Sequence, residues 1–344
     1  MPRKQSTASP TNPMKTMRIK TPMAGFLAGA ILLVSMPHLL CARDNNDVAH
    51  KSVQLAISLI EKSAATYVDK RECFSCHHQA LTMMALDRAR RAGFKVGEES
   101  ISMQSRFTIE YFKDRIDRLP KGQGVPGGPY SAGYALTGLA AAGEPGNKTT
   151  DALIQYLLNS QNKDGSWHIR THRPPLEDSH FTATALAIKG LGKFEDPEKR
   201  AKPIQRAVEW LIKADPKTTE DHVFRVFGLQ WGNAKKDSND AAGLLLKLQR
   251  KDRGWSQMPN MESDAYATGQ ALVALKESGL LEPGSPQFKG GIRWLVEHQE
   301  PDGSWHVKTR NKPIQKYFES DFPHGKDQFI SISATCWAEM ALLP

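Results

Sequence analysis

The stretch GIRWLVEHQEPDGSW, residues 291–305, decides how the chain folds. Its apolar helical pattern reaches Leu295, and Gln299 follows after three further residues. A polar turn then carries an aspartate, Gly303 and Trp305. A glutamine at a helix end can satisfy backbone groups that the helix leaves free, a glycine permits a sharp turn, and a tryptophan can pack over both. The stretch therefore predicts a helix, a tight turn and a packed tryptophan as one unit.

The same unit occurs twice more, as YLLNSQNKDGSW (156–167) and LLLKLQRKDRGW (244–255). Each repeats the leucine, the glutamine after three intervening residues, and the glycine and tryptophan of the ending, so that the turns lie near 161–167, 249–255 and 299–305. A fourth helical segment, AVEWLIKADP (207–216), keeps the Trp-Leu pair but lacks the glutamine and the turn. Self-similarity of this kind indicates a repeat architecture.

Helices rich in small residues lie between these units, and their apolar composition is typical of buried helices. Each follows a more amphipathic helix, and Gly or Pro marks the joins. We expect buried helices at 78–92, 130–142, 180–191, 222–231, 265–278 and 330–343. We expect outer helices at about 50–68, 101–118, 147–161, 201–214, 239–250 and 288–299. Six hairpins without strands predict an all-α chain closed into an (α/α)6 toroid, and an open solenoid of the same units is the alternative.

The first 42 residues have the order of a secretory signal, which is basic, then apolar, then small. The apolar stretch runs from Met23 to Leu40, and Ala42 stands where cleavage is expected. An uncleaved anchor is the alternative, but the stretch is short for a membrane span of ~20 residues. We therefore expect residues 1–42 to be a cleaved signal peptide, residues 43–344 to form a single toroid domain, and the protein to be exported to the periplasm or the cell exterior.

The net charge of the whole chain is inflated by its N-terminus. The formal charge is +9, and removing residues 1–42 with their five basic side chains lowers it to +4. Basic and acidic residues are interspersed in the remainder, without a basic stripe. This pattern argues against nucleic acid as a partner.

The Leu-x3-Gln…Gly-x-Trp units resemble the QW repeats of squalene–hopene and oxidosqualene cyclases, and the related repeats of protein prenyltransferase β subunits. The resemblance covers roughly residues 130–344. It implies an α/α toroid whose central cavity takes a hydrophobic small molecule such as an isoprenoid, with peripheral membrane contact. The acidic DxDD motif of squalene-type cyclases is absent from the sequence, and no Asp or His pattern around Cys336 completes the zinc site of a prenyltransferase.

In such a toroid the inner helices run the same way, so their N-termini meet at one mouth of the cavity, with Ala, Gly, Thr and Met along the wall below. Two segments, LEDSHFTATAL (176–186) and MESDAYATGQAL (261–272), place carboxylates just before an inner helix, and the fourth inner helix is expected to begin near His222 and Arg225. Aspartate is also a favoured N-cap, so capping is the alternative role. The candidate catalytic residues are Asp178, His180, Glu262, Asp264 and Tyr266.

The segment CFSCHHQ, residues 73–79, leaves four interpretations open. Cys73-Phe-Ser-Cys76-His77 matches C-x-x-C-H and predicts a c-type haem held by both cysteines, with His77 as the metal ligand. Cys76 and Gln79 also have the spacing of an internal thioester, and in this they resemble the thioester domains of complement and alpha-macroglobulin proteins.

The other two interpretations use the same cysteines differently. Cys76 and a neighbouring histidine could bind zinc or copper together with His180, His222 or Asp264 across the mouth. Alternatively, Cys73 forms a structural disulfide with Cys76 or Cys336, as an exported chain favours.

These features predict an exported terpenoid-cyclase-like toroid that binds a hydrophobic or amphipathic ligand in its cavity, lacks the DxDD acid, and carries a c-type haem at CFSCH. One alternative is an isoprenoid cyclase or lyase that uses Asp178, Glu262 or Asp264 as its acid. Another is a binding module without chemistry, and a glycan ligand is a further alternative because polysaccharide-active enzymes also use (α/α) barrels.

Overall fold

The computed structural model describes residues 37–312 and 316–344, and their side chains from residue 47 onward. The expected signal peptide lies outside this part apart from its last few residues, which begin helix α1 (Pro37–Lys70). The chain divides into two compact units, Met1–Arg43 and Asp44–Pro344, and the second carries the fold. Among the described residues, no helix combines the length and the apolar composition that crossing a bilayer requires.

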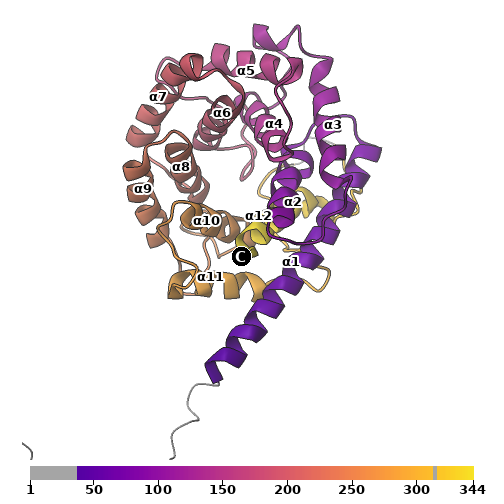
Figure 1. Cartoon of the computed structure of the whole chain (residues 1–344), viewed down its shortest axis with the longest axis vertical. Helices are drawn as coiled ribbons and strands as arrows, with labels where there is room; N and C mark the ends of the chain where they lie inside the picture. The colour runs from indigo at the N-terminus through magenta and orange to yellow at the C-terminus, as the bar shows by residue number, and fades with distance from the viewer. Residues whose placement is uncertain (1–36, 313–315) are drawn as a thin grey trace, which may run out of the picture. The chain divides into compact units, whose positions relative to one another are not determined.

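The unit from Asp44 to Pro344 is a ring of paired helices (Figure 1). The inner helices are α2 (Leu81–Arg91), α4 (Pro129–Ala141), α6 (His180–Phe194), α8 (Thr219–Trp231), α10 (Ala265–Glu277) and α12 (Gln328–Leu342). The outer helices are α1, α3 (Ser100–Lys113), α5 (Lys148–Ser160), α7 (Pro197–Lys213), α9 (Lys235–Lys247) and α11 (Pro286–Glu297). The six expected hairpins are therefore present, and the described residues contain no β-strand beyond isolated bridges.

The ring is closed. Each inner helix packs against the next in chain order, and the last, α12, packs against the first, α2. Close approach is possible because small residues face the neighbouring helices. A Cβ atom on Gly269 of α10 would lie 2.7 Å from the backbone nitrogen of Ala338 in α12. The closed toroid is thus confirmed over the open solenoid.

Each repeat unit fastens three helices together. In the first, Gln161 Nε2 donates to the carbonyls of Gly165 (2.9 Å) and Pro203 (2.8 Å), the second of which belongs to the next outer helix. The indole of Trp167 donates to Leu157 at 2.8 Å, and its backbone N–H donates to Thr184 of α6 at 3.0 Å. One glutamine and one tryptophan therefore set the relative positions of α5, α6 and α7.

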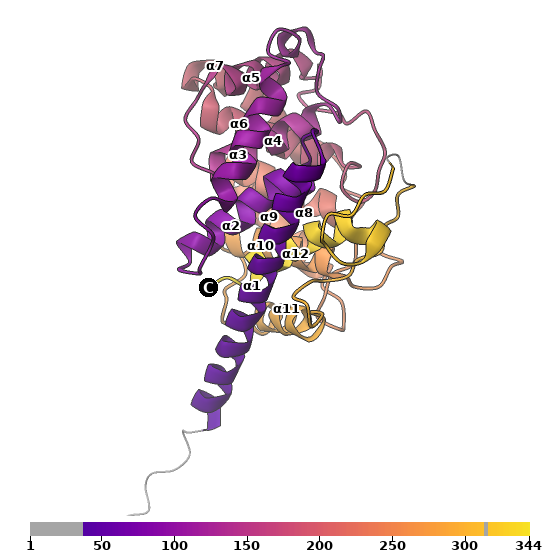
Figure 2. The same ribbon diagram turned by 90° about the vertical axis from the view of Figure 1, so that its right-hand side faces the viewer.

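The other two units make the same bonds. Gln249 donates to the carbonyls of Arg253 and Gln287 at 3.0 and 2.9 Å. Gln299 donates to Gly303 and, in the first outer helix α1, to Ser52, both at 3.0 Å. The last repeat thereby holds the first helix, and the views in Figures 1 and 2 show the end of α11 beside α1.

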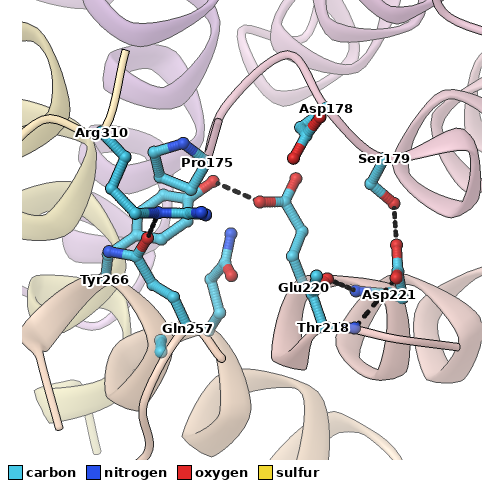
Figure 3. A pocket seen from close by; sticks show the side chains of 11 residues that line it. Pro175, Asp178, Ser179, Thr218, Glu220, Asp221, Gln257, Tyr266 and Arg310 are labelled. Atoms are coloured by element: carbon cyan, nitrogen blue, oxygen red, sulfur yellow. Dashed lines mark hydrogen bonds between the residues drawn. The ribbon is translucent and has the colours of Figure 1, made fainter. Parts of the chain in front are cut away.

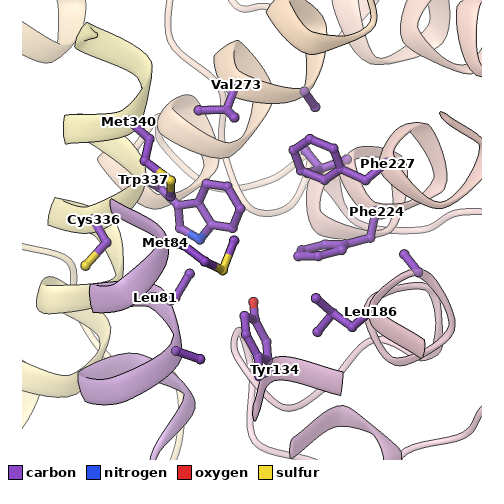
Figure 4. Close-up of a cluster of buried hydrophobic side chains, with 14 of the residues drawn as sticks. Leu81, Met84, Tyr134, Leu186, Phe224, Phe227, Val273, Cys336, Trp337 and Met340 are labelled. Carbon is purple, nitrogen blue, oxygen red and sulfur yellow. The ribbon is translucent and has the colours of Figure 1, made fainter. Parts of the chain in front are cut away.

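Aromatic side chains fill the middle of the ring, as Figure 4 shows. The rings of Phe224 and Phe227 from α8 lie 6.3 and 6.1 Å from that of Trp337 on α12, and all three are buried. Met84 and Tyr134 close the cluster from α2 and α4. The interior therefore differs from the expected wall of small residues, because the small residues face neighbouring helices while large ones point toward the axis.

Candidate functional site

A pocket of about 40 Å³ lies where the N-terminal ends of α6, α8 and α10 meet (Figure 3). It has room for only a few water molecules at roughly 10–15 Å³ each. The loop before α6 and the loop after α11 complete its wall. The lining residues are Pro175, Asp178, Ser179, Thr218, Glu220, Asp221, Gln257, Tyr266, Ala267, Gln270 and Arg310.

Glu220 is the side chain in this pocket that is best placed to act as a proton donor. Its side chain is buried, Thr182 donates to Oε1 at 2.7 Å, and the hydroxyl of Tyr266 donates to Oε2 at 3.0 Å. No cation is among its hydrogen-bond partners in the described residues. Burial raises the pKa of Glu220 well above its ordinary value, and the two hydrogen bonds offset only part of that effect. Burial therefore favours the neutral form of the carboxyl group, which is the form that can give up a proton.

The adjacent carboxylate, Asp221, has a structural role. Ser179 donates to its Oδ1 at 2.6 Å, and the backbone N–H groups of Lys217 and Thr218 donate to its Oδ2 at 2.9 and 3.0 Å. With Thr218 it forms the capping box that starts α8. Two neighbouring acids thus differ in role because one meets several donors at a helix end and the other faces the pocket.

Sequence reasoning missed Glu220 because it placed the start of this inner helix near His222. The helix begins at Thr219. The signal was available, since Thr218 and Asp221 have the spacing of a capping box. Arg225, the other residue expected at the mouth, instead donates to the carbonyl of Ile212 in the outer helix α7.

Two of the expected catalytic residues reach the pocket. Tyr266 is buried and holds Glu220, as described above. Asp178 lines the pocket with its carboxylate directed toward Glu220 (Figure 3) and contacts His172. Burial raises the pKa of Asp178, against the opposing effects of His172 and Arg310.

The other three expected residues lie elsewhere. His180 stacks on His168, with ring centroids 4.1 Å apart. Glu262 is exposed in the loop before α10. Asp264 caps α10 by accepting from the N–H of Ala267 at 3.0 Å, and burial raises its pKa to about 6. Of these, Asp264 has the capping role that its residue type favours.

The cysteines of the CFSCHHQ segment are free thiols, and so is Cys336. Cys73 Sγ lies 3.2 Å from the hydroxyl of Tyr67 in α1. Cys76 opens the π-turn Cys76–Ala80, and burial raises the pKa of its thiol to about 11. Neither disulfide considered from the sequence is therefore formed in this structure.

The side-chain amide of Gln79 forms hydrogen bonds with residues other than Cys76, the residue to which an internal thioester would join it. Its Oε1 accepts from the N–H of Ser75 at 2.8 Å, and its Nε2 donates to Gln104 of α3 at 3.2 Å. The amide thus ties the π-turn to the outer helix α3. An internal thioester would need the Gln79 carbonyl carbon at the Cys76 sulfur, and this packing does not provide it.

A haem or metal ion does not fit the segment as it is packed. The Nδ1 atoms of His77 and His78 lie 2.6 Å apart, and the His77 ring packs near Tyr67 (6.3 Å) and Phe329 (5.9 Å). A porphyrin at His77 would displace these contacts. Across residues 37–312 and 316–344, no group of three or more His, Cys, Asp or Glu is placed to hold a metal ion. The c-type haem predicted from the sequence would therefore require this segment to repack.

Comparison with known proteins gives the fold its context. A probable squalene–hopene cyclase from Sinorhizobium fredii is 26% identical over 283 residues, which are 74% of this chain and 38% of that protein. A chloroplastic (-)-kolavenyl diphosphate synthase from Tripterygium wilfordii is 27% identical over 143 residues, which are 39% of this chain and 17% of that protein. No protein-family model matches the chain.

Among solved structures, a variant of the type II terpene cyclase MstE from Scytonema, in complex with geranylgeranyl dihydroxybenzoate, aligns with a TM-score of 0.55. The alignment covers 88% of this chain and 98% of that one at 17% identity. The chain has the α/α toroid fold of the terpenoid cyclases. Unsaturated glucuronyl hydrolase from Bacillus sp. GL1 aligns with a TM-score of 0.50 at 14% identity, so this terpenoid-cyclase-like ring also resembles a carbohydrate-active toroid in fold.

Proposed function

We propose that this terpenoid-cyclase-like ring binds an isoprenoid and that Glu220 protonates one of its carbon–carbon double bonds. The observation that carries the proposal is a buried carboxyl group at the polar end of an interior that contains aromatic side chains. Glu220 is held by Thr182 and Tyr266 without a cationic partner. Protonating an alkene requires an acid in its uncharged form, and burial favours that form.

The aromatic cluster supports the same chemistry. Protonation leaves a carbocation, and aromatic faces stabilise cations through their quadrupoles. Phe224, Phe227 and Trp337 lie together inside the ring, with centroids 5.7–6.3 Å apart. The interior therefore combines a proton donor with a surface suited to the charge that the proton creates.

The reaction needs no co-reactant. The proton of Glu220 forms a new C–H bond at one alkene carbon, and the π electrons of a second alkene close a ring onto the cation. A C–H next to the new cation then gives up its proton to a water molecule, and its bonding electrons form the alkene of the product. Glu220 takes a proton back from solvent, so the net change is an isomerisation. Because the pocket beside Glu220 is only about 40 Å³, it has to widen to admit a prenyl chain.

Incubation with polyprenyl substrates in D₂O tests the proposal. Each turnover should place deuterium on carbon in a product of unchanged formula apart from that exchange. Glu220→Gln should abolish incorporation, and Tyr266→Phe should slow it by about 10-fold or more, as loss of one oriented hydrogen bond in a catalytic site does. Glu262→Gln is the matched control, because Glu262 is exposed outside the pocket. Deuterium incorporation that survives Glu220→Gln would exclude Glu220 as the acid.

A further inference from the structure

The interior holds several buried polar atoms that have no hydrogen-bond partner among the described residues. They are the hydroxyl groups of Tyr130 and Tyr134, the amide of Gln270, the indole nitrogen of Trp337 and the carboxyl of Glu339. All five side chains are fully buried, with exposed fractions of 0–1%. An unpaired buried polar group destabilises the folded state, so five of them in the interior of one ring require an explanation.

Three of these groups point at the region where a ligand would lie. Figure 4 shows the Tyr134 hydroxyl and the Trp337 indole directed into the same apolar cluster from α4 and α12. Gln270 of α10 lines the pocket that contains Glu220. A pure hydrocarbon in this space would leave all three groups unpaired. An oxygen atom on the ligand could accept from the indole, the amide or the phenol.

The charge of the pocket limits what kind of oxygen group it accepts. Its carboxyl side chains are Asp178, Glu220 and Asp221, and its cationic side chain is Arg310. Arg310 Nε is already bonded to Gln257 at 2.8 Å. An anionic group such as a diphosphate would be repelled there, whereas a hydroxyl or ether oxygen carries no such penalty.

We propose that the ring selects a neutral, oxygen-bearing isoprenoid, whose hydroxyl or ether oxygen accepts a hydrogen bond from Tyr134, Gln270 or Trp337. This inference rests on the proposed function, because it names the substrate class of the same interior. Such selection would distinguish the interior of this ring from a binding site for a hydrocarbon and from a binding site for a prenyl diphosphate.

Binding of three C20 probes to the Glu220→Gln protein tests the inference without turnover. The probes are geranylgeraniol, its diphosphate, and the polyene hydrocarbon that lacks the oxygen. We expect geranylgeraniol to bind about tenfold tighter than either of the others, because a site with unpaired donors discriminates against a ligand that cannot pair them. Tyr134→Phe combined with Gln270→Leu should remove most of that difference. Tyr156→Phe on the outer helix α5 should leave it unchanged.

Thermal stability of the free protein gives a second readout. Removing an unpaired buried hydroxyl is neutral or stabilising, so Tyr134→Phe should not lower Tm. A lower Tm would mean that the hydroxyl already has a partner, and would overturn the inference. Equal binding of the hydrocarbon and the alcohol would overturn it while leaving the proposed function standing. If none of the three probes binds, the proposed function fails and takes the inference with it.

Discussion

Gln299 and Ser52 are 247 positions apart in the chain and are joined by a hydrogen bond of 3.0 Å from the glutamine amide to the serine carbonyl. The same amide also caps the turn at Gly303. Further bonds follow along α1, from Ser63 to the carbonyl of Ser320 at 2.8 Å and from Lys70 to that of Glu319 at 2.9 Å. Hydrogen bonds between the first outer helix and the segment after α11 therefore help to close the ring.

Gln299→Leu should destabilise the protein by about 1–3 kcal/mol, because it leaves the carbonyls of Ser52 and Gly303 without their donor. Urea unfolding measures the change. Gln249→Leu is the matched control, since Gln249 makes equivalent bonds in a more exposed setting, where water can replace the lost donor. Equal losses for the two variants would show that ring closure adds nothing to the ordinary cost of the turn.

Gly303→Ala should be more destabilising than a typical glycine replacement. Gly303 has φ +93, and a Cβ atom there would lie 2.8 Å from the carbonyl carbon of Leu55. Both the left-handed backbone and the contact with α1 oppose a side chain, so we expect a loss of more than about 1 kcal/mol.

Gly243→Ala should have the opposite effect on stability to Gly303→Ala. Gly243 lies in the middle of α9, and nothing lies within 4 Å of its Cβ position. Alanine should stabilise the protein by about 0.5–1 kcal/mol through its better helix propensity. Equal effects of the two substitutions would argue that the contact between Gly303 and Leu55 is absent in solution.

The contribution of His77 to stability should fall as the pH is lowered below about 6.5, the value for an unfolded histidine, while the raised pKa values of Glu220 and Asp264 act in the opposite direction. Burial, and secondarily Arg173, lowers the pKa of His77 to about 3 in the folded protein. Between these values the unfolded chain binds one more proton at this residue, so acid favours unfolding, by at most about 1.4 kcal/mol per pH unit.

Unfolding free energies measured from pH 7 to pH 4 check this expectation. Relative to the wild type, His77→Gln should change the slope of the profile by about one proton, toward greater stability in acid. His50→Gln, at an exposed position, should leave the profile unchanged. A variant at His77 that keeps the wild-type slope would place the acid sensitivity at other groups.

The CFSCHH segment is expected to carry thiols and no haem when the protein is expressed with its own N-terminus in a host that matures c-type cytochromes. The packing of His77 against Tyr67 and Phe329 is the reason. Intact mass and the visible spectrum decide the matter, and the same mass reports whether residues 1–42 have been removed. A haem mass with a Soret band would contradict the expectation and require the segment to repack.

The repeated glutamine, glycine and tryptophan predicted the hairpins from the sequence alone, because each acts on its own turn and on helices next in order. The tertiary structure decided between the expected closed ring and the open solenoid, since α12 packs against α2. The candidate catalytic carboxyl group, that of Glu220, was harder to predict from the sequence. Asp178 and Tyr266 were found by their position before an inner helix, but Glu220 was missed because α8 begins three residues earlier than expected, at Thr219 rather than His222.

Sequence by itself determined the local units and their number, since capping, turns and apolar periodicity are short-range properties. Only the tertiary structure decided which carboxyl is buried without a cation, which polar atoms are unpaired, and that aromatic rings occupy the axis. Those properties depend on side chains from α4, α8, α10 and α12 meeting across the ring. Burial and electrostatics are set by such neighbours, far apart in the chain, and no short-range pattern records them.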